Sequence, residues 1–255
     1  MFYPADPALL RRTVEQALAQ AAAGRDTGAA TPPKALIAPH AGYRYSGPVA
    51  AAAYATVLPL RGQVERVVIL GPAHTVPLAA VAASEADAFA GPLGAAPVDS
   101  AAVRRLVDAG LVVVSDEAHA AEHAIEVQLP FVQVALGDVH IVPLVVGEVP
   151  ARAVADVLDA VWGGPETLIV VSTDLSHYHD HRTATELDRR TAAAILATRP
   201  EALGRGDACG LFALRGFLAA AERRQLEVDL LRLATSADTA GDPDRVVGYG
   251  AFAFA

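Results

Sequence analysis

Short apolar runs alternate with longer, alanine-rich segments of helical periodicity along this 255-residue chain, and this alternation constrains the fold more than any other feature. Runs of roughly four to eight apolar residues bounded by turn signals are typical of buried strands, and strands that alternate with helices indicate an α/β domain around a central sheet. The pattern predicts strands at 35–38, 65–70, 111–114, 140–146, 168–172, 227–233 and 246–254. It predicts helices at 7–22, 48–57, 100–109, 125–136, 151–162, 183–197 and 210–224.

The predicted elements follow one another without a repeat or an obvious linker. Asp6 is suited to cap the first helix, because Pro7 then occupies the first helical position. Residues 25–33 form a polar, proline-containing connection, but it lies too early to separate two domains. We therefore expect a single domain that spans residues 1–255.

The charge balance excludes several classes of partner. Lysine and arginine number 20 against 29 acidic residues, which gives a formal net charge of −9. Nucleic acids and anionic membranes both require a basic face, so we expect neither as a partner. The longest uncharged stretch, 67–84, is interrupted by two prolines and a histidine and does not resemble a membrane span.

Two compositional details bear on compartment and chemistry. The start of the chain lacks the charged and apolar regions of a signal peptide, and Cys209 is the only cysteine, so we expect a cytoplasmic protein. Lys34 is the only lysine, and no glycine-rich nucleotide motif or G-x-S-x-G elbow occurs. Schiff-base chemistry, nucleotide binding and serine-esterase activity are therefore disfavoured.

Three predicted strands are each followed by a turn that carries a histidine: His40, His74 and His177. Ligands of open α/β sheets bind beyond the carboxyl ends of the strands, where loops from several strands converge. One histidine in a loop would be unremarkable, but three at equivalent places suggest a shared crevice. Because imidazole is the commonest protein metal ligand, this crevice is a candidate metal site.

Cys209 and Asp174 are further candidates for the same site. Asp207 is suited to cap the helix predicted at 210–224, and a thiol near a helix N-terminus is expected to have a lowered pKa. Two histidines and a thiolate would suit copper, zinc or iron. Asp174 lies three residues before His177, where its carboxylate could orient the imidazole or bind metal.

The segment H-A-A-E-H at 119–123 offers an alternative site. It matches the H-x-x-E-H pattern of inverted zinc peptidases, in which both histidines bind zinc and the glutamate is the general base. The pattern is short, and the apolar positions that follow place the helix start near Glu122, which would leave His119 in a loop. A zinc peptidase is therefore a remote alternative.

Several segments of the chain together resemble the Memo family, whose bacterial members are called AmmeMemoRadiSam system protein B. The matching segments run in order over nearly the whole chain: F-Y-P-A-D-P at 2–7, A-P-H-A-G-Y at 38–43, Y-S-G at 45–47, G-P-A-H at 71–74, E-H-A-I-E-V-Q-L-P-F at 122–131, S-T-D-L-S-H at 172–177 and D-A-C-G at 207–210.

The resemblance implies a three-layer α/β/α sandwich around a central mixed sheet, related to the class III extradiol dioxygenases. It implies that His40, His74 and Cys209 bind a metal, with Asp174 and His177 lining the same pocket. His123 lies in a family motif, but the resemblance gives it no clear role. Extradiol dioxygenases use a carboxylate where this chain has Cys209, and a thiolate at this place changes the electronics of iron and favours copper or zinc instead. We expect a divalent or redox metal, iron or copper first and zinc as the alternative.

We therefore expect a metal-dependent oxidation of a small molecule, with His177 as general acid/base and Asp174 assisting. The alternative is a protein that holds copper or iron, or binds a partner protein, without turnover. The family name associates such proteins with a radical-SAM protein, which suggests a pathway partner of that kind.

Overall fold

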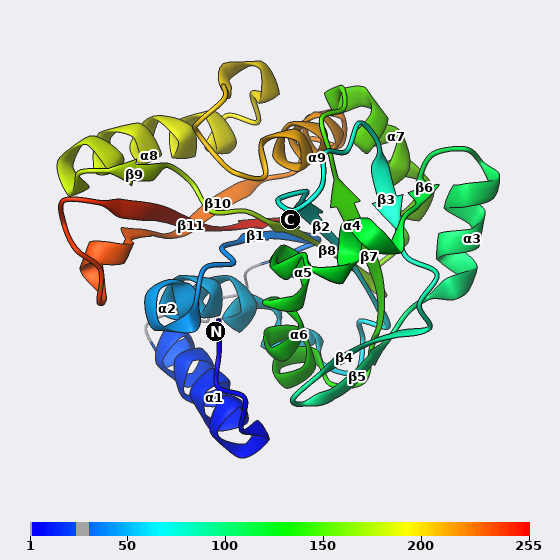
Figure 1. The fold of residues 1–255 in the computed structure, drawn as a ribbon, viewed down its shortest axis with the longest axis horizontal. Helices are drawn as coiled ribbons and strands as arrows, with labels where there is room; N and C mark the ends of the chain where they lie inside the picture. Colours follow the sequence, from blue (N-terminus) through cyan, green and yellow to red (C-terminus); the bar gives the residue numbers. More distant parts are fainter. Residues whose placement is uncertain (1, 24–30) are drawn as a thin grey trace.

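The computed structural model describes residues 2–23 and 31–255, and its centre is a nine-stranded mixed sheet (Figure 1). Eight strands follow the order β10-β11-β1-β8-β2-β7-β3-β6, and β9 pairs with β11 outside this path. The strand bounds are β1 (Ala35–Ala38), β2 (Arg66–Pro72), β3 (Val81–Ala83), β6 (Val113–Val114), β7 (His140–Val146), β8 (Thr167–Ser172), β9 (His177–His179), β10 (Val228–Thr235) and β11 (Val246–Phe254). A separate hairpin is formed by β4 (Ala88–Gly91) and β5 (Gly94–Pro97).

Four adjacent strands, β1, β8, β2 and β7, are parallel to one another and form the middle of the sheet. Nearly all of their residues are buried, as expected for strands covered on both faces. Antiparallel pairing occurs on either side, where β11 pairs with β1 and β3 pairs with β7. The carboxyl ends of the four parallel strands therefore open at one edge of the sheet.

Helices cover both faces of this sheet. Figure 1 shows α1, α2 and α6 on one side and α7, α8 and α9 on the other, so the predicted α/β/α sandwich is confirmed. The helix bounds are α1 (Pro7–Ala23), α2 (Tyr43–Tyr54), α3 (Ser100–Asp108), α4 (Asp116–Ala120), α5 (His123–Glu126), α6 (Leu129–Leu136), α7 (Ala151–Val161), α8 (His181–Leu196) and α9 (Leu211–Arg223). Within the described ranges, every helix lacks the length and apolar character that a membrane crossing requires.

Most predicted elements are present, and the differences have local causes. Asp6 caps α1 as expected, because its carboxylate accepts the Leu9 N–H at 2.7 Å. The helix expected at 48–57 begins earlier, at Tyr43, whose N–H is bonded to the carbonyl of Phe2 at 2.7 Å. It ends in a 3-10 helix, Ala55–Leu60.

Other elements were not predicted because they are short. The helix expected at 125–136 is divided into α5 and α6, and the sequence pattern did not reveal α4 or the strands β3, β4, β5 and β9. The predicted connection at 25–33 lies largely outside the described residues.

Asp99 joins α3 to the sheet. Its carboxylate caps α3 by accepting the Ala102 N–H at 2.8 Å and pairs with Arg66 Nε at 2.7 Å, at the start of β2. Burial by itself raises the pKa of Asp99, but these hydrogen bonds and the Arg66 charge outweigh it and hold the pKa below the ordinary value of 3.8. The charged form therefore stabilises the fold above the ordinary pKa, and this contribution is lost as the pH falls through the lowered pKa.

We expect Asp99→Asn, which keeps a capping oxygen but removes the charge, to lower the free energy of unfolding by about 1 kcal/mol at neutral pH. The difference from the wild type should shrink in acid, where Asp99 becomes neutral as well. Urea unfolding at neutral and acidic pH measures this, with Asp108→Asn at the exposed end of α3 as control. A difference in unfolding free energy between Asp99→Asn and the wild type that stays the same in acid would contradict a stabilising role of the Asp99 charge.

Candidate metal centre

Three neighbouring parallel strands each present a polar side chain two residues beyond their carboxyl end. His40 follows β1, Asp174 follows β8 and His74 follows β2, and these strands lie side by side in the order β1-β8-β2. Of the three histidines predicted to share a crevice, His40 and His74 lie together at this edge, whereas His177 lies on β9, which pairs with β11. Ligand sites of α/β proteins are commonly built at this edge.

His40 and His74 meet a third histidine, His123, at the start of α5. One ligand atom from each of the three lies within 4.8 Å of the others, close enough for one metal ion to be shared. The ring centroids are 5.3 Å apart for His40 and His74, 5.4 Å for His40 and His123, and 4.9 Å for His74 and His123. His40 is buried, His123 is half-buried and His74 is exposed, so the cluster is accessible from one side.

The close approach of α5 to β2 brings His123 to the cluster. Gly71, near the end of β2, permits this approach, because a Cβ at this position would lie 3.0 Å from the Cβ of Ala124 and 3.3 Å from Ile125. A larger residue at position 71 would push α5 and His123 away from His74.

The tautomer of His40 follows from the buried hydroxyl of Ser172. This hydroxyl donates to the Ala124 carbonyl at 2.6 Å and accepts the Gln128 amide at 2.8 Å. Since its proton is used, the His40 Nδ1 atom at 2.9 Å must be the donor in the remaining bond. The free lone pair of His40 is then on Nε2. Burial, with His74 and His123 nearby, lowers the pKa of His40 well below its ordinary value, so this imidazole is neutral, as a metal ligand must be.

The Glu122 carboxylate fixes the tautomer of His74 in the same way. Its carboxylate accepts the His74 backbone N–H at 2.7 Å and Nδ1 at 2.9 Å, which leaves Nε2 of His74 free. It also caps α5 by accepting the Ala124 N–H at 2.8 Å. Burial by itself raises the pKa of Glu122, but the bonds from His74 and Ala124 outweigh it and bring the pKa to about 2. Carboxylates in this position commonly orient metal-binding imidazoles.

His123 is held chiefly by aromatic stacking. Its ring stacks on Phe2 at 4.3 Å with an interplanar angle of 8°, and its Nδ1 lies 3.5 Å from Glu122. Burial is the main cause of the lowered pKa of His123, which favours the neutral form. The sequence pattern suggested metal binding by His123 only in the remote zinc-peptidase alternative, together with His119, and the family resemblance implied no clear role for it.

Cys209 lies beside the histidine cluster. Its Sγ atom is 3.3 Å from Nε2 of His40 and accepts the Asp174 N–H at 3.2 Å. The predicted lowering of its pKa is wrong: burial and the nearby Asp174 carboxylate raise the pKa of Cys209 to about 12. The predicted cap is also absent, because Asp207 accepts the Gly204 N–H at 2.6 Å, and α9 begins only at Leu211.

Asp174 and His177 have separate partners in the structure. Asp174 accepts the backbone N–H of His40 at 2.8 Å, and burial raises its pKa. His177, at the start of β9, has Nδ1 2.7 Å from the carbonyl of Leu175. A carbonyl can only accept, so Nδ1 carries the proton and Nε2 is free to accept another.

His119 does not join the cluster. It lies in α4, which ends before α5 begins, and its Nε2 donates to the carbonyl of Ala82 at 3.1 Å. The expectation that His119 lies in a loop is therefore wrong, although the expected break before His123 is present. Because α4 and α5 do not form one helix, His119 and His123 do not share a face as the zinc-peptidase pattern requires.

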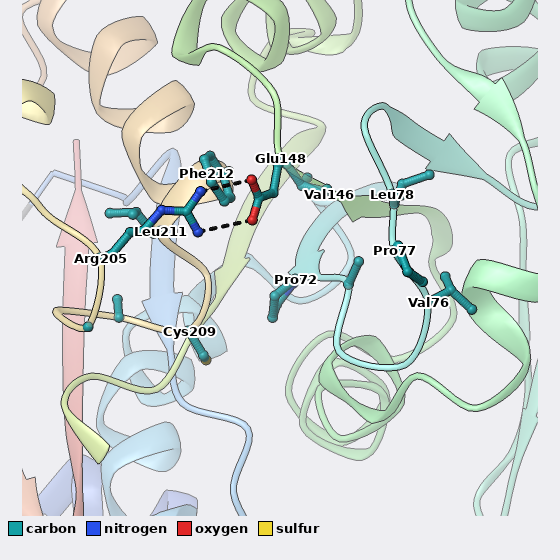
Figure 2. A pocket seen from close by; sticks show the side chains of 14 residues that line it. Pro72, Val76, Pro77, Leu78, Val146, Glu148, Arg205, Cys209, Leu211 and Phe212 are labelled. Atoms are coloured by element: carbon teal, nitrogen blue, oxygen red, sulfur yellow. Dashed lines mark hydrogen bonds and ion pairs between the residues drawn. The ribbon is translucent and has the colours of Figure 1, made fainter. Parts of the chain in front are cut away.

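Figure 2 shows a cavity of about 310 Å³ whose lining includes residues adjacent to the cluster. Pro72 and Ala73, which immediately precede His74, form part of its wall, and Cys209 forms another part. The cavity therefore adjoins the loop that carries His74 and the Cys209 thiol beside His40, and it offers space for a small molecule next to the cluster.

Comparison with known proteins gives a consistent family match. The family model described as "Memo-like protein" matches residues 1–253. The MEMO1 family protein MK0963 of Methanopyrus kandleri is 38% identical over 272 residues, which cover 99% of this chain and 95% of the relative. A MEMO1 family protein of Thermotoga maritima is 38% identical over 229 residues, covering 85% and 81%.

One solved structure resembles the fold. It is titled "uncharacterized protein JW3007" and comes from Escherichia coli K12. The TM-score is 0.52 at 15% sequence identity, and the match covers 84% of this chain and 98% of that one. At this identity the similarity concerns the fold alone.

We expect Glu122→Gln to weaken metal binding by about 10- to 100-fold, because the neutral amide no longer fixes and polarises the His74 ring. Competition with a chromophoric chelator measures the affinity. Glu126→Gln is the matched control, since Glu126 lies in the same short helix but bonds to Tyr3. Equal affinities of the two variants would contradict the role given to Glu122.

Proposed function

Because this chain belongs to the Memo family, we propose that its histidine cluster holds a redox metal, iron or copper, and that the protein uses it to oxidise a small molecule. The observation that carries the proposal is the convergence of ligand atoms of His40, His74 and His123 within 4.8 Å. The hydrogen bonds to Ser172 and Glu122 support it, because they engage Nδ1 of both His40 and His74 and so place the lone pair of each ring on Nε2.

The donor set fits such a metal. His40, His74 and His123 supply imidazole nitrogens, and the Cys209 sulfur lies next to His40. The raised pKa of Cys209 favours the thiol, which a coordinating metal ion would deprotonate. Imidazole with thiolate suits iron, copper and zinc better than the hard cations magnesium or calcium. A bound iron or copper ion would supply electron transfer between the substrate and O2 and would polarise a substrate oxygen.

His177 and Asp174 would support the reaction without binding the metal. His177 has its Nδ1 proton committed to Leu175, so its Nε2 would take a proton from a substrate hydroxyl and later return it. Asp174 would hold the loop of His40 through the backbone bond at 2.8 Å and so fix one metal ligand.

The second candidate is a protein that retains copper or iron without turnover, as a member of a radical-SAM pathway. The observation behind it is that Cys209 Sγ lies 3.3 Å from Nε2 of His40, outside the group of three histidines, so that a shift of its side chain would add a fourth donor. A metal with four protein ligands has a closed coordination sphere, as in structural sites, whereas catalytic sites keep an open position. Tight retention of metal without any O2 consumption would support this candidate.

We expect His123→Ala to abolish stoichiometric metal binding, whereas His119→Ala should leave it unchanged. The two histidines belong to the same H-A-A-E-H segment, but of these two His123 alone is part of the cluster. Elemental analysis of protein purified without oxygen or affinity-tag metal measures the content, with His40→Ala and Cys209→Ser alongside.

Loss of metal in His119→Ala together with retention of metal in Cys209→Ser would favour the zinc-peptidase alternative. Wild-type protein that takes up no metal on titration would overturn the proposed function altogether.

We expect His177→Ala to lower O2 uptake with a catechol-like substrate by about 100-fold or more, because general acid–base catalysis contributes on that order. Metal content should be unchanged, which separates proton transfer from metal binding. His140→Ala is the control, since His140 is exposed at the opposite edge of the sheet, where β7 begins. Unchanged uptake in His177→Ala would remove the acid/base role.

A further inference from the structure

The cavity beside the cluster has walls of mixed polarity, with apolar side chains along its sides and charged groups at one end. Figure 2 shows Val76, Pro77 and Leu78 on one side and Leu211 and Phe212 on another. Among the residues that the structure describes, two charged side chains line it, Arg205 and Glu148. Its volume of about 310 Å³ is near the lower end for ligand pockets, which suits a molecule with one ring or a short chain.

Arg205 and Glu148 pair across one end of this cavity. Two guanidinium nitrogens of Arg205 bond to the two carboxylate oxygens of Glu148 at 3.0 and 2.8 Å (Figure 2). The Arg205 guanidinium also lies 5.6 Å from the ring centre of Phe212, which holds it at the cavity wall. The geometry is the bidentate one by which arginine recognises carboxylates.

This ion pair is poorly suited to a purely structural role. The side chains of Arg205 and Glu148 are 74% and 60% exposed, and exposed pairs contribute little to stability because water competes for both charges. The guanidinium also carries more N–H donors than the two bonds to Glu148 use. An incoming carboxylate can therefore take the remaining donors or replace Glu148.

We propose that this cavity binds a small monocarboxylate, with its carboxylate on Arg205 and its apolar body along Phe212, Leu211 and Leu78. Glu148 is an internal competitor that occupies the same donors when the cavity is empty. The other end of the bound molecule lies toward Cys209 and the segment that leads to His74. In that respect the inference rests on the proposed function, because it names the substrate class of the same centre.

The probe for this site is benzoate, and benzamide is its uncharged counterpart of the same shape. Isothermal titration calorimetry is carried out on the protein as purified and again after treatment with a chelator. We expect wild-type protein to bind benzoate roughly tenfold or more tightly than benzamide. Arg205→Gln should lose this preference, and Glu148→Gln should bind benzoate several-fold more tightly because the competitor is neutral.

Two further variants test the location. Leu78→Trp should lower the benzoate affinity by filling the cavity without altering either charge. Arg152→Gln is the matched control, since Arg152 is an exposed arginine in an ion pair with Asp156 on α7, and it should bind benzoate as the wild type does. Because Arg205 and Glu148 are exposed, their variants are expected to fold, and their melting temperatures check this.

Several outcomes would overturn the inference: equal binding of benzoate and benzamide, no binding of benzoate by the wild type, or an Arg205→Gln variant with undiminished affinity. Weaker binding of benzoate by Glu148→Gln would also overturn it, because Glu148 would then support the position of Arg205 and would not compete with the ligand. A protein that binds no metal but retains the Arg205-dependent preference for benzoate would refute the proposed function alone. Full metal content without benzoate binding would refute this inference alone.

Discussion

The buried hydroxyl of Ser172 is the hydrogen-bonding centre on which the site depends. It is fully buried at the end of β8, and it joins His40, Gln128 and the carbonyl of Ala124. Gln128 in turn bonds to the carbonyl of Pro39 at 3.0 Å and to the hydroxyl of Tyr54 at 3.0 Å. One network thus fixes the β1 loop, the α5 segment and α2 relative to β8, and every polar atom named here has a partner, which such a buried network requires.

This network also explains why the site needs both regular strands and irregular connections. The parallel strands β1, β8 and β2 place His40, Asp174 and His74 at one edge of the sheet. Parallel strands alone would leave the site open above these loops. The short helix α5 closes it, because Gly71 permits its approach and Glu122 both caps the helix and holds His74. A single carboxylate therefore ties the start of α5 to the loop after β2.

The sequence was sufficient to predict the parts of the site that follow regular structure. Apolar runs identified β1, β2 and β8, so the positions of His40 and His74 followed from the rule that sites form at strand ends. It did not predict that His123 meets His40 and His74, because that depends on the tertiary packing of α5 against β2 at Gly71. The pKa of Cys209 was also predicted wrongly, for two reasons. Asp207 resembles an N-cap in sequence, but its carboxylate bonds to the Gly204 N–H instead. The burial that raises the pKa of the thiol depends on tertiary packing, which the local sequence does not show.

The candidate metal ligands lie on rigid elements, whereas the charged residues of the cavity lie in exposed loops. This difference indicates which residues can change without disturbing the histidine cluster. His40 and His74 are fixed by strands, buried hydrogen bonds and a helix cap, so their geometry tolerates little change. Arg205 and Glu148 are exposed and lie in loops, one before α9 and the other after β7. Since loops on a rigid framework accept substitution most readily, exchange of these two residues would alter the charge of the accepted molecule while leaving the metal centre intact.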